Sequence, residues 1–419
     1  MFTKIESLRF RCLRYICQPT SRFHVLVGPN ASGKTTFLDV IAFLGQLVGE
    51  GLDAAINERT KNFQDLIWQR SKGEFELAVE ASIPEAKRAK LSEPGFDTIR
   101  YEVRIGQDSE GDVSILWEKV LLKISAEDAC TNYQPDLFPS PLAPPESILH
   151  KGARGIKTVI KKVPGGNDNY YSEVYGESGK GWAPAFKLGP RKSALGNLPE
   201  DESKFPASTW LKQLLTNGVQ KFVLNSALIR MASPPGQLRG FKPDGSNLPW
   251  IVESLKTRAA PRFAEWIAHV QTALPDIADI RTIEREDDRH RYLMLCYSNG
   301  LEVPSWMASD GTLRLLALTI TAYLPDFFGV YLIEEPENGI HPKAVETMFQ
   351  SLSHVYDAQI LMATHSPVVL SIVDPGDVLC FAKDDSGATD IVTGSNHPAL
   401  RDWRHECNLS TLFAAGVLG

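Results

Sequence analysis

A glycine-rich run near the start of the chain, GPNASGKT at residues 28–35, has the composition and spacing of a phosphate-binding loop. Gly28 and Gly33 allow backbone N–H groups to wrap around phosphate oxygens, and Lys34 can place a positive charge on the outer phosphates. The Thr35 hydroxyl can ligate magnesium, and the N-terminus of a following helix favours an anion. An apolar strand pattern, FHVLV, precedes the run and a helical pattern follows it. The residues therefore have the strand–loop–helix setting that phosphate binding requires.

Two adjacent glutamates end an apolar run in the C-terminal part of the chain. GVYLIEEP at residues 329–336 has the continuous apolar character of a strand buried in a parallel sheet, and it delivers Glu334 and Glu335 to its C-terminal end. The first carboxylate could hold magnesium, and the second could polarise an attacking water as a general base. Taken alone, the pattern also fits a strand that ends in solvated acids.

Two further polar segments lie close to this strand in the sequence. ATHSP at residues 363–367 ends the next apolar run, where His365 could sense a γ-phosphate by hydrogen bonding. ASDGTLR at residues 308–314 precedes a helical pattern, and its Ser309 hydroxyl and free N–H groups could face an anion. Each segment also has a simpler interpretation. His365 could be a histidine whose hydrogen bonds are satisfied within the fold, and Ser309 could be an ordinary helix N-cap.

The order of these four elements resembles that of the ABC ATPases, and more narrowly their SMC/RecF-like branch and the AAA family ATPases of bacterial defence operons. In this resemblance GPNASGKT is the Walker A motif, Glu334 and Glu335 form the Walker B motif, and His365 is the switch histidine. The Ser-Asp-Gly turn stands at the signature motif, and Glu337 with Asn338 begins the D-loop. The resemblance covers about residues 1–125 and 205–419.

The resemblance implies a site for ATP and Mg²⁺. Its catalytic residues would be Lys34, Glu335 and His365. Its magnesium ligands would be Thr35, Glu334 and Gln64, with Gln69 as the alternative to Gln64. RFRCL at 9–13 is similar to the Asn-Phe-Arg motif of the branch, which would bring Arg11 to the nucleotide. The residues expected around the nucleotide are Gly28, Pro29, Asn30, Ala31, Ser32, Gly33, Lys34, Thr35, Thr36, Arg11, Ser309, Asp310, Gly311 and Asn338.

Three features depart from the family pattern. Glu334 stands where the Walker B motif usually has aspartate, and the signature reads Ser-Asp-Gly-Thr instead of Leu-Ser-Gly-Gly-Gln. Residues 126–205 stand where SMC proteins have coiled-coil arms, so tethering of DNA by long arms is not expected. Because the signature of one copy completes the site of another in this family, the resemblance implies an ATP-dependent homodimer or a larger even assembly.

The expected fold is α/β, a P-loop NTPase head of the ABC type with a mainly parallel sheet, an antiparallel β-subsheet and an inserted subdomain. Residues 1–27 are predicted to form two strands, and β-rich runs at 74–83, 98–105 and 113–124 suggest the antiparallel sheet. The predicted parts of the chain are an N-terminal lobe at 1–125, a proline-rich and hairpin insertion at 126–205, a helical and hairpin segment at 206–300 and a C-terminal lobe at 301–419.

Three charged segments carry weaker signals. The run from Lys151 to Lys162 is rich in lysine and arginine, and it could contact nucleic-acid phosphates or form a solvated surface. EDESK at 200–204, and Asp384 with Asp385, contain nuclease-like acids but lack matching partners, so we interpret them as loops. No Toprim or nuclease motif can be placed, which argues against a self-contained nuclease.

The net charge of −7 argues against a uniformly basic nucleic-acid binder, and no apolar run reaches the ~18 residues that a membrane span needs. We therefore expect a cytoplasmic ATPase without a membrane partner. It would act as a switch on an operon-encoded effector, a nuclease or toxin, in anti-phage defence, with residues 126–205 as the surface for the trigger or partner. The alternatives are a RecF-like repair ATPase and a slow-turnover nucleotide sensor.

Overall fold

The computed structural model describes residues 1–71, 73–92, 95–108, 110–125, 144–152, 155–174, 184–237, 240–325 and 327–397. The chain divides into two compact units, which are described separately. The first unit comprises Met1–Ser21, Pro29–Val219 and Phe381–Ile391, and the second comprises Arg22–Gly28, Gln220–Cys380 and Val392–Gly419. Most of the proline-rich run predicted in the insertion falls within 126–143, outside the described residues.

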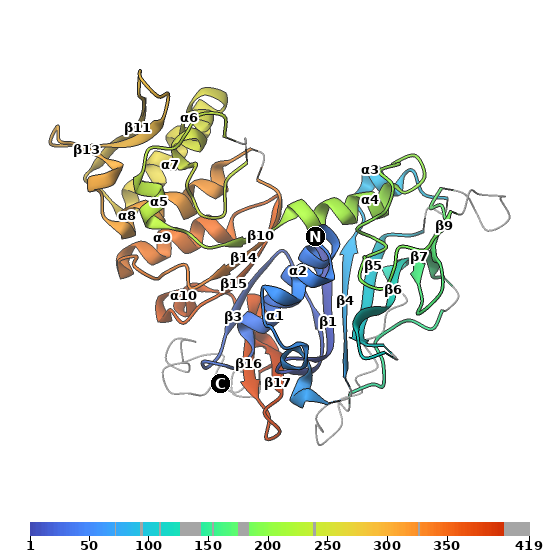
Figure 1. Ribbon diagram of the computed structural model, residues 1–419. Coiled ribbons are helices and arrows are strands. Elements are labelled where there is room, and N and C mark those ends of the chain that lie inside the picture. The colour runs from blue at the N-terminus through green and yellow to red at the C-terminus, as the bar shows by residue number, and fades with distance from the viewer. Residues whose placement is uncertain are drawn as a thin grey trace. The chain divides into compact units, whose positions relative to one another are not determined.

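An eight-stranded antiparallel sheet dominates the first unit, with strand order β2-β1-β4-β5-β6-β7-β8-β9 (Figure 1). Its strands are β1 (Phe2–Phe10), β2 (Leu13–Pro19), β4 (Glu74–Ser82), β5 (Thr98–Gln107), β6 (Val113–Lys123), β7 (Lys157–Lys162), β8 (Asp168–Tyr170) and β9 (Ala185–Phe186). The predicted antiparallel sheet is confirmed, and β7 and β8 form the predicted hairpin. In the described part of 126–205, the chain thus adds strands to this sheet.

The two faces of the sheet differ in chemistry. On one face, the Phe43 ring of α1 lies 5.7 Å from the rings of both Phe10 and Phe75, so an apolar layer joins helix and sheet. The opposite face carries Glu76 and Glu102, whose side chains are nevertheless fully buried. Segment 144–152 covers them, and both carboxylates accept its backbone N–H groups.

Helices of the first unit are short apart from the one that follows the glycine-rich loop. They are α1 (Lys34–Gly49), α2 (Leu52–Asn57), α3 (Glu85–Arg88) and α4 (Pro206–Gln213), with the 3₁₀ turns η1 (Phe63–Leu66) and η2 (Trp68–Arg70) and the π turn η4 (Leu214–Gly218). Ten of the sixteen residues of α1 are buried, which explains its strong apolar periodicity.

A six-stranded sheet with the order β10-β14-β15-β3-β16-β17 has its centre in the second unit. Its strands are β10 (Val219–Phe222), β14 (Gly329–Glu334), β15 (Ala358–Ala363), β3 (Phe23–Val27), β16 (Val378–Lys383) and β17 (Thr389–Thr393). The pairs β14–β15, β15–β3 and β16–β3 are parallel. Every residue of β3 and β15 is buried, as expected for strands covered on both faces.

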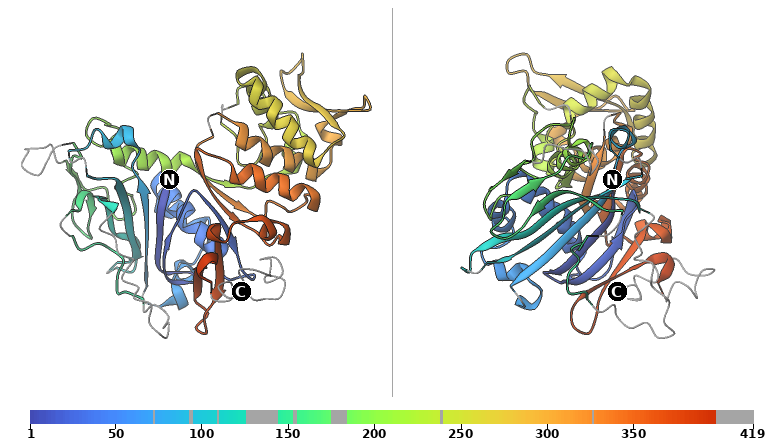
Figure 2. Two further views of the ribbon diagram at one scale, coloured as in Figure 1. Left: turned by 180° about the vertical axis from the view of Figure 1, so that it is seen from behind. Right: turned by 90° about the vertical axis from the view of Figure 1, so that its right-hand side faces the viewer.

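Helices and a smaller sheet complete the second unit. The helices are α5 (Ser226–Arg230), α6 (Leu248–Arg258), α7 (Ala260–Ala273), α8 (Asp310–Thr319), α9 (Pro342–Ser353) and α10 (Pro367–Ile372), with the 3₁₀ turns η5 (Ser305–Met307), η6 (Ile320–Tyr323), η7 (Pro375–Asp377) and η8 (Gly394–Asn396). The antiparallel strands β11 (Ile277–Glu284), β12 (Arg291–Tyr297) and β13 (Glu302–Pro304) lie beside α6 and α7 (Figure 2). The hairpin predicted within 206–300 is thereby confirmed, and Asp287 and Asp288 lie in its turn.

The two strands predicted in residues 1–27 are present as β1 and β3, but the prediction missed a third strand, β2. The β1–β2 turn contains no glycine, proline or asparagine. Instead, Arg9 and Arg11 adopt positive φ values of 62° and 53°, which a sequence pattern does not signal.

Candidate nucleotide-binding site

The glycine-rich loop lies between β3 and α1, in the predicted strand–loop–helix order. Gly33 precedes the first helical residue with φ 107°, a conformation that favours glycine, and its carbonyl accepts the Phe37 N–H at 2.8 Å. Ala31 also has a positive φ, 63°, although it is not glycine. The loop residues Pro29, Asn30 and Ala31 are exposed. The loop is therefore open to solvent at the helix N-terminus, where an anion is favoured.

Contacts within the first unit hold the loop in shape. Thr389 donates its hydroxyl to the Ser32 carbonyl at 2.9 Å, and the Lys34 Nζ donates to the Pro29 carbonyl at 2.9 Å. A Cβ atom on Gly33 would lie 2.2 Å from the Thr389 Oγ1, so this position has no space for a side chain. Sequence reasoning missed Thr389, which lies more than 350 residues beyond the loop.

Three neighbouring strands of the second unit end at one edge of the parallel sheet. Glu334 of β14 pairs with Ala363 of β15, and Ala363 pairs with Leu26 of β3. The Glu335 N–H donates to the Ala363 carbonyl at 2.8 Å, and the Thr364 N–H donates to the Leu26 carbonyl at 3.2 Å. The two glutamates, the Thr-His segment and the start of the glycine-rich loop therefore leave the sheet at the same edge, where ligands bind in such folds.

Residues of the turn after β14 form hydrogen bonds with both the Walker B segment and the histidine segment. The Asn338 amide donates to the Glu335 carboxylate, and Glu335 itself adopts a positive φ of 47°. The Glu337 carboxylate accepts the Thr364 hydroxyl at 2.6 Å and the His365 N–H at 3.0 Å. Glu337 thus fixes the backbone of the predicted switch histidine, a role that the sequence did not indicate.

The other predicted metal carboxylate has a basic neighbour in the same unit. The Lys221 Nζ lies 2.8 Å from the Glu334 Oε1. Sequence reasoning also missed Lys221, because β10 and β14 are separated by more than 100 residues in the chain. A positive charge therefore lies directly beside the carboxylate that is predicted to hold magnesium.

The signature segment caps α8 and packs on the turn after β14. The Ser309 hydroxyl accepts the Thr312 N–H at 3.1 Å, as an N-cap does. Asp310 forms an ion pair with Arg230, which also donates to the Trp306 carbonyl at 3.2 Å. A Cβ atom on Gly311 would lie 2.3 Å from the carbonyl oxygen of Gly339. The glycine therefore allows a close approach between the signature helix and the D-loop.

Arg11 and the two candidate glutamines make contacts within the first unit. The Arg11 guanidinium lies 3.2 Å from the Asp39 carboxylate of α1. The Gln64 amide donates to the Gln107 side chain at 3.2 Å. Gln69 is exposed with a positive φ of 48°. Nothing in these contacts distinguishes Gln64 from Gln69 as a magnesium sensor, and the roles of all three residues stay predictions.

The donor set suits a nucleotide with Mg²⁺. In the first unit, the exposed loop and Lys34 suit phosphate, and the Thr35 hydroxyl is a hard oxygen donor of the kind that Mg²⁺ prefers. In the second unit, the Glu334 carboxylate is a donor of the same kind. Among the residues that the structure describes, no three or more His, Cys, Asp or Glu side chains are grouped to hold a metal by themselves. Mg²⁺ in nucleotide sites uses one or two protein oxygens together with the phosphates, so the residues fit this ion.

A glycine-rich loop between strand and helix, followed by two glutamates and a histidine at the ends of neighbouring parallel strands, defines a P-loop NTPase head of the ABC type. The chain belongs to the family described as "AAA domain, putative AbiEii toxin, Type IV TA system", whose profile matches residues 23–371. No curated protein matches the sequence significantly.

Solved structures with a similar fold are heads of SMC proteins. One is described as the "SmcHead bound to the C-winged helix domain of ScpA", with 13% identity, a TM-score of 0.51 and coverage of 93% of this chain and 96% of that chain. Another is an Smc head with an extended coiled coil bound to the C-terminal domain of ScpA derived from Pyrococcus furiosus, with 14% identity, a TM-score of 0.50 and coverage of 96% and 99%. At these identities the likeness concerns the fold, and it confirms the predicted fold of a P-loop NTPase head.

No helix in the part of the chain that the structure describes is long and apolar enough to cross a membrane. The longest described helix, α1, has 16 residues, so the described residues contain no coiled-coil arm of the SMC kind.

Proposed function

We propose that this protein is an ATP-hydrolysing switch that pairs head to head around ATP and thereby regulates an effector. The observation that carries the proposal is the shared edge of β3, β14 and β15, from which the glycine-rich loop, the two glutamates and His365 all emerge. Membership of a family of AAA domains supports nucleotide hydrolysis as the activity.

Each site residue has a role that its chemistry supports. Lys34 and the loop N–H groups would bind the phosphates, and Thr35 and Glu334 would hold Mg²⁺, which neutralises charge on the phosphates. Glu335 would orient and polarise the attacking water. Its carboxylate is held by the Asn338 amide, which fixes its direction. His365, whose backbone is fixed by Glu337, would contact the γ-phosphate.

Pairing of two copies follows from the family arrangement, in which a signature segment closes the site of the other copy. In this chain the signature lies beside exposed apolar side chains, Trp306 at 46% exposure and Met307 at 70% exposure, which favours burial against a second surface. The matched SMC heads bind a partner protein, ScpA, and the family description names a toxin. The ScpA-bound heads support a partner protein as the regulated effector, and the family description supports a toxin–antitoxin system. Anti-phage defence is the setting that we propose.

The test compares Glu335→Gln with the wild type in a steady-state ATPase assay and in light scattering with ATP and Mg²⁺. Without the negative charge at this position, the variant should still bind the nucleotide but not activate water. Hydrolysis should therefore fall at least about 100-fold, and a dimer or larger even assembly should accumulate.

Glu346→Gln, which changes an exposed glutamate of α9, is the matched control and should behave as the wild type. A strictly monomeric Glu335→Gln protein that still hydrolyses ATP would contradict the proposal. Slow wild-type turnover with long retention of ATP would favour the sensor alternative.

A further inference from the structure

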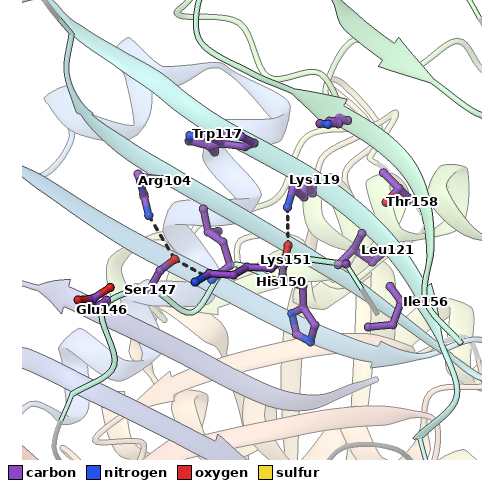
Figure 3. A pocket seen from close by; sticks show the side chains of 13 residues that line it. Arg104, Trp117, Lys119, Leu121, Glu146, Ser147, His150, Lys151, Ile156 and Thr158 are labelled. Atoms are coloured by element: carbon purple, nitrogen blue, oxygen red, sulfur yellow. Dashed lines mark hydrogen bonds between the residues drawn. The ribbon is translucent and has the colours of Figure 1, made fainter. Parts of the chain in front are cut away.

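A second concave site lies on the charged face of the antiparallel sheet in the first unit. It is a pocket of about 740 Å³ between the strands β5, β6 and β7 and the segment 146–152 (Figure 3). Arg104, Trp117, Lys119, His150, Lys151 and Lys161 are among the residues that line it. The nucleotide-site proposal uses none of them.

The charges on the pocket wall are predominantly positive. Arg104, Lys119, Lys151 and Lys161 face one carboxylate of the lining, that of Glu146. Two of the four cations have acidic neighbours beneath the wall. Arg104 pairs with the buried Glu76, and Lys119 lies 3.8 Å from the buried Glu102.

The remaining two cations are available to a ligand. Lys151 and Lys161 are exposed, and neither ammonium group makes a hydrogen bond or ion pair with any residue that the structure describes. Lys161 is also the direct cross-strand partner of Lys119, an arrangement of like charges that destabilises a sheet. An anion bound between these two strands would reduce the repulsion between the two ammonium groups. Binding of such a ligand would therefore stabilise the sheet at this position.

An aromatic side chain and an apolar floor accompany the cations. Trp117 pairs with Arg104 across β5 and β6 and lies two residues from Lys119 on the same face of β6. Its ring is partly exposed, and the Lys119 Nζ lies 5.5 Å from the ring centroid. Leu121 and Ile156 form apolar parts of the lining.

The wall formed by the segment 146–152 is fixed by charged side chains of the sheet. Lys119 donates to the His150 carbonyl at 2.5 Å, and Arg100 donates to the Ile148 carbonyl at 2.9 Å. The Glu102 carboxylate accepts the His150 N–H at 3.0 Å. Because these partners lie on the sheet itself, the pocket is formed before any ligand arrives, which lowers the entropic cost of binding.

We propose that this pocket binds single-stranded nucleic acid, with an unpaired base against Trp117 and its flanking phosphates on Lys151 and Lys161. Cations beside an aromatic side chain in a concave site are the recurring chemistry of single-strand recognition. A duplex fits less well, since its bases are stacked and paired and a base would first have to leave the helix. The net charge of −7 for the chain does not oppose this, because binding depends on the local field of the pocket. Binding here requires no ATP turnover, so this proposal and the ATPase proposal fail independently.

The test measures fluorescence anisotropy of labelled 20-nucleotide single-stranded DNA and RNA with the full-length protein, over a range of salt concentrations. Lys151→Ala with Lys161→Ala removes two phosphate contacts. The slope of log K against log salt should become less negative by about 1.4, and affinity at 50 mM salt should fall about 10- to 100-fold. Trp117→Ala should weaken binding by about 5- to 100-fold without changing that slope, because stacking involves no phosphate.

The matched control is Lys61→Ala with Lys383→Ala, two exposed lysines of the same unit that do not line the pocket. It makes the same change in net charge and should leave affinity and slope close to those of the wild type. Equal losses in the control and the pocket variant would overturn the proposal, because general charge would then explain binding. Absence of oligonucleotide binding, tighter binding of the matching duplex, or binding of polyglutamate in place of the oligonucleotide would overturn it as well.

Discussion

Replacement of Gly311 by alanine tests the packing between the signature helix and the D-loop. Gly311 lies in the first turn of α8, where alanine would ordinarily stabilise a helix by about 0.5–1 kcal/mol. Its Cβ atom would, however, lie 2.3 Å from the Gly339 carbonyl oxygen, and a backbone atom cannot turn aside as a side chain can. Overpacking of this kind costs about 1–3 kcal/mol. Because the contact outweighs the helix preference, we expect a net loss of about 1–2 kcal/mol.

The assay is thermal unfolding followed by circular dichroism, with Gly240→Ala as the matched control. An added Cβ at Gly240 meets no atom within 4 Å, so the control should unfold close to the wild-type temperature. For a unit of this size, 1 kcal/mol corresponds to about 2–4 °C, so Gly311→Ala should unfold about 2–8 °C lower. A Gly311→Ala protein as stable as the wild type, or more stable, would contradict the close approach of position 311 to the Gly339 carbonyl. The helix preference of alanine would then be the only effect on stability at this position.

Two further predictions concern the phosphate loop and the buried charges of the first unit. Lys34→Ala should abolish ATP binding or hydrolysis while leaving the circular dichroism spectrum unchanged, since the lysine supplies the main side-chain charge for the phosphates; unchanged turnover would contradict the site. Burial works to raise the pKa of Glu80, but the charges of Arg100, Lys123 and Lys4 outweigh it and lower the pKa to about 2. The charged form therefore stabilises the fold above the unfolded pKa of 4.5, and this contribution, up to about 3 kcal/mol, should be lost as the pH falls from about 4.5 towards 2. Unfolding by urea at several pH values should show this loss in the wild type and a weaker pH dependence in Glu80→Gln; equal pH dependence would count against the buried ion pairs.

The motifs of the site were predictable because each is a local pattern. GPNASGKT brings its glycines, lysine and threonine together within eight residues, and the apolar runs before Glu334 and before His365 are long enough to predict buried strands. Parallel strands of this kind place their carboxyl ends at one edge, so even the grouping of these segments followed from the sequence. The structure agrees with each of these strands.

The partners that fix those motifs were not predictable. Thr389 bonds to the Ser32 carbonyl, and Glu337 holds the His365 N–H, across separations of 357 and 28 residues. Neither contact has a signature in residue type, because a threonine or a glutamate in a turn is ordinary by composition. Only the folded chain shows which backbone group each side chain reaches.

The charged face of the antiparallel sheet shows the same limit most clearly. Alternation along EFELAVEAS puts Glu76 and Glu80 on one face of β4. A period of two residues assigns side chains to a face but contains no information on what covers that face. The sequence by itself thus determined the strands, the loop chemistry and the order of the motifs, all of which depend on neighbours in the chain. The tertiary structure decided that the Glu76 carboxylate is buried beneath the segment 144–152. This burial depends on a distant segment, and the sequence of β4 contains no information on where that segment will lie.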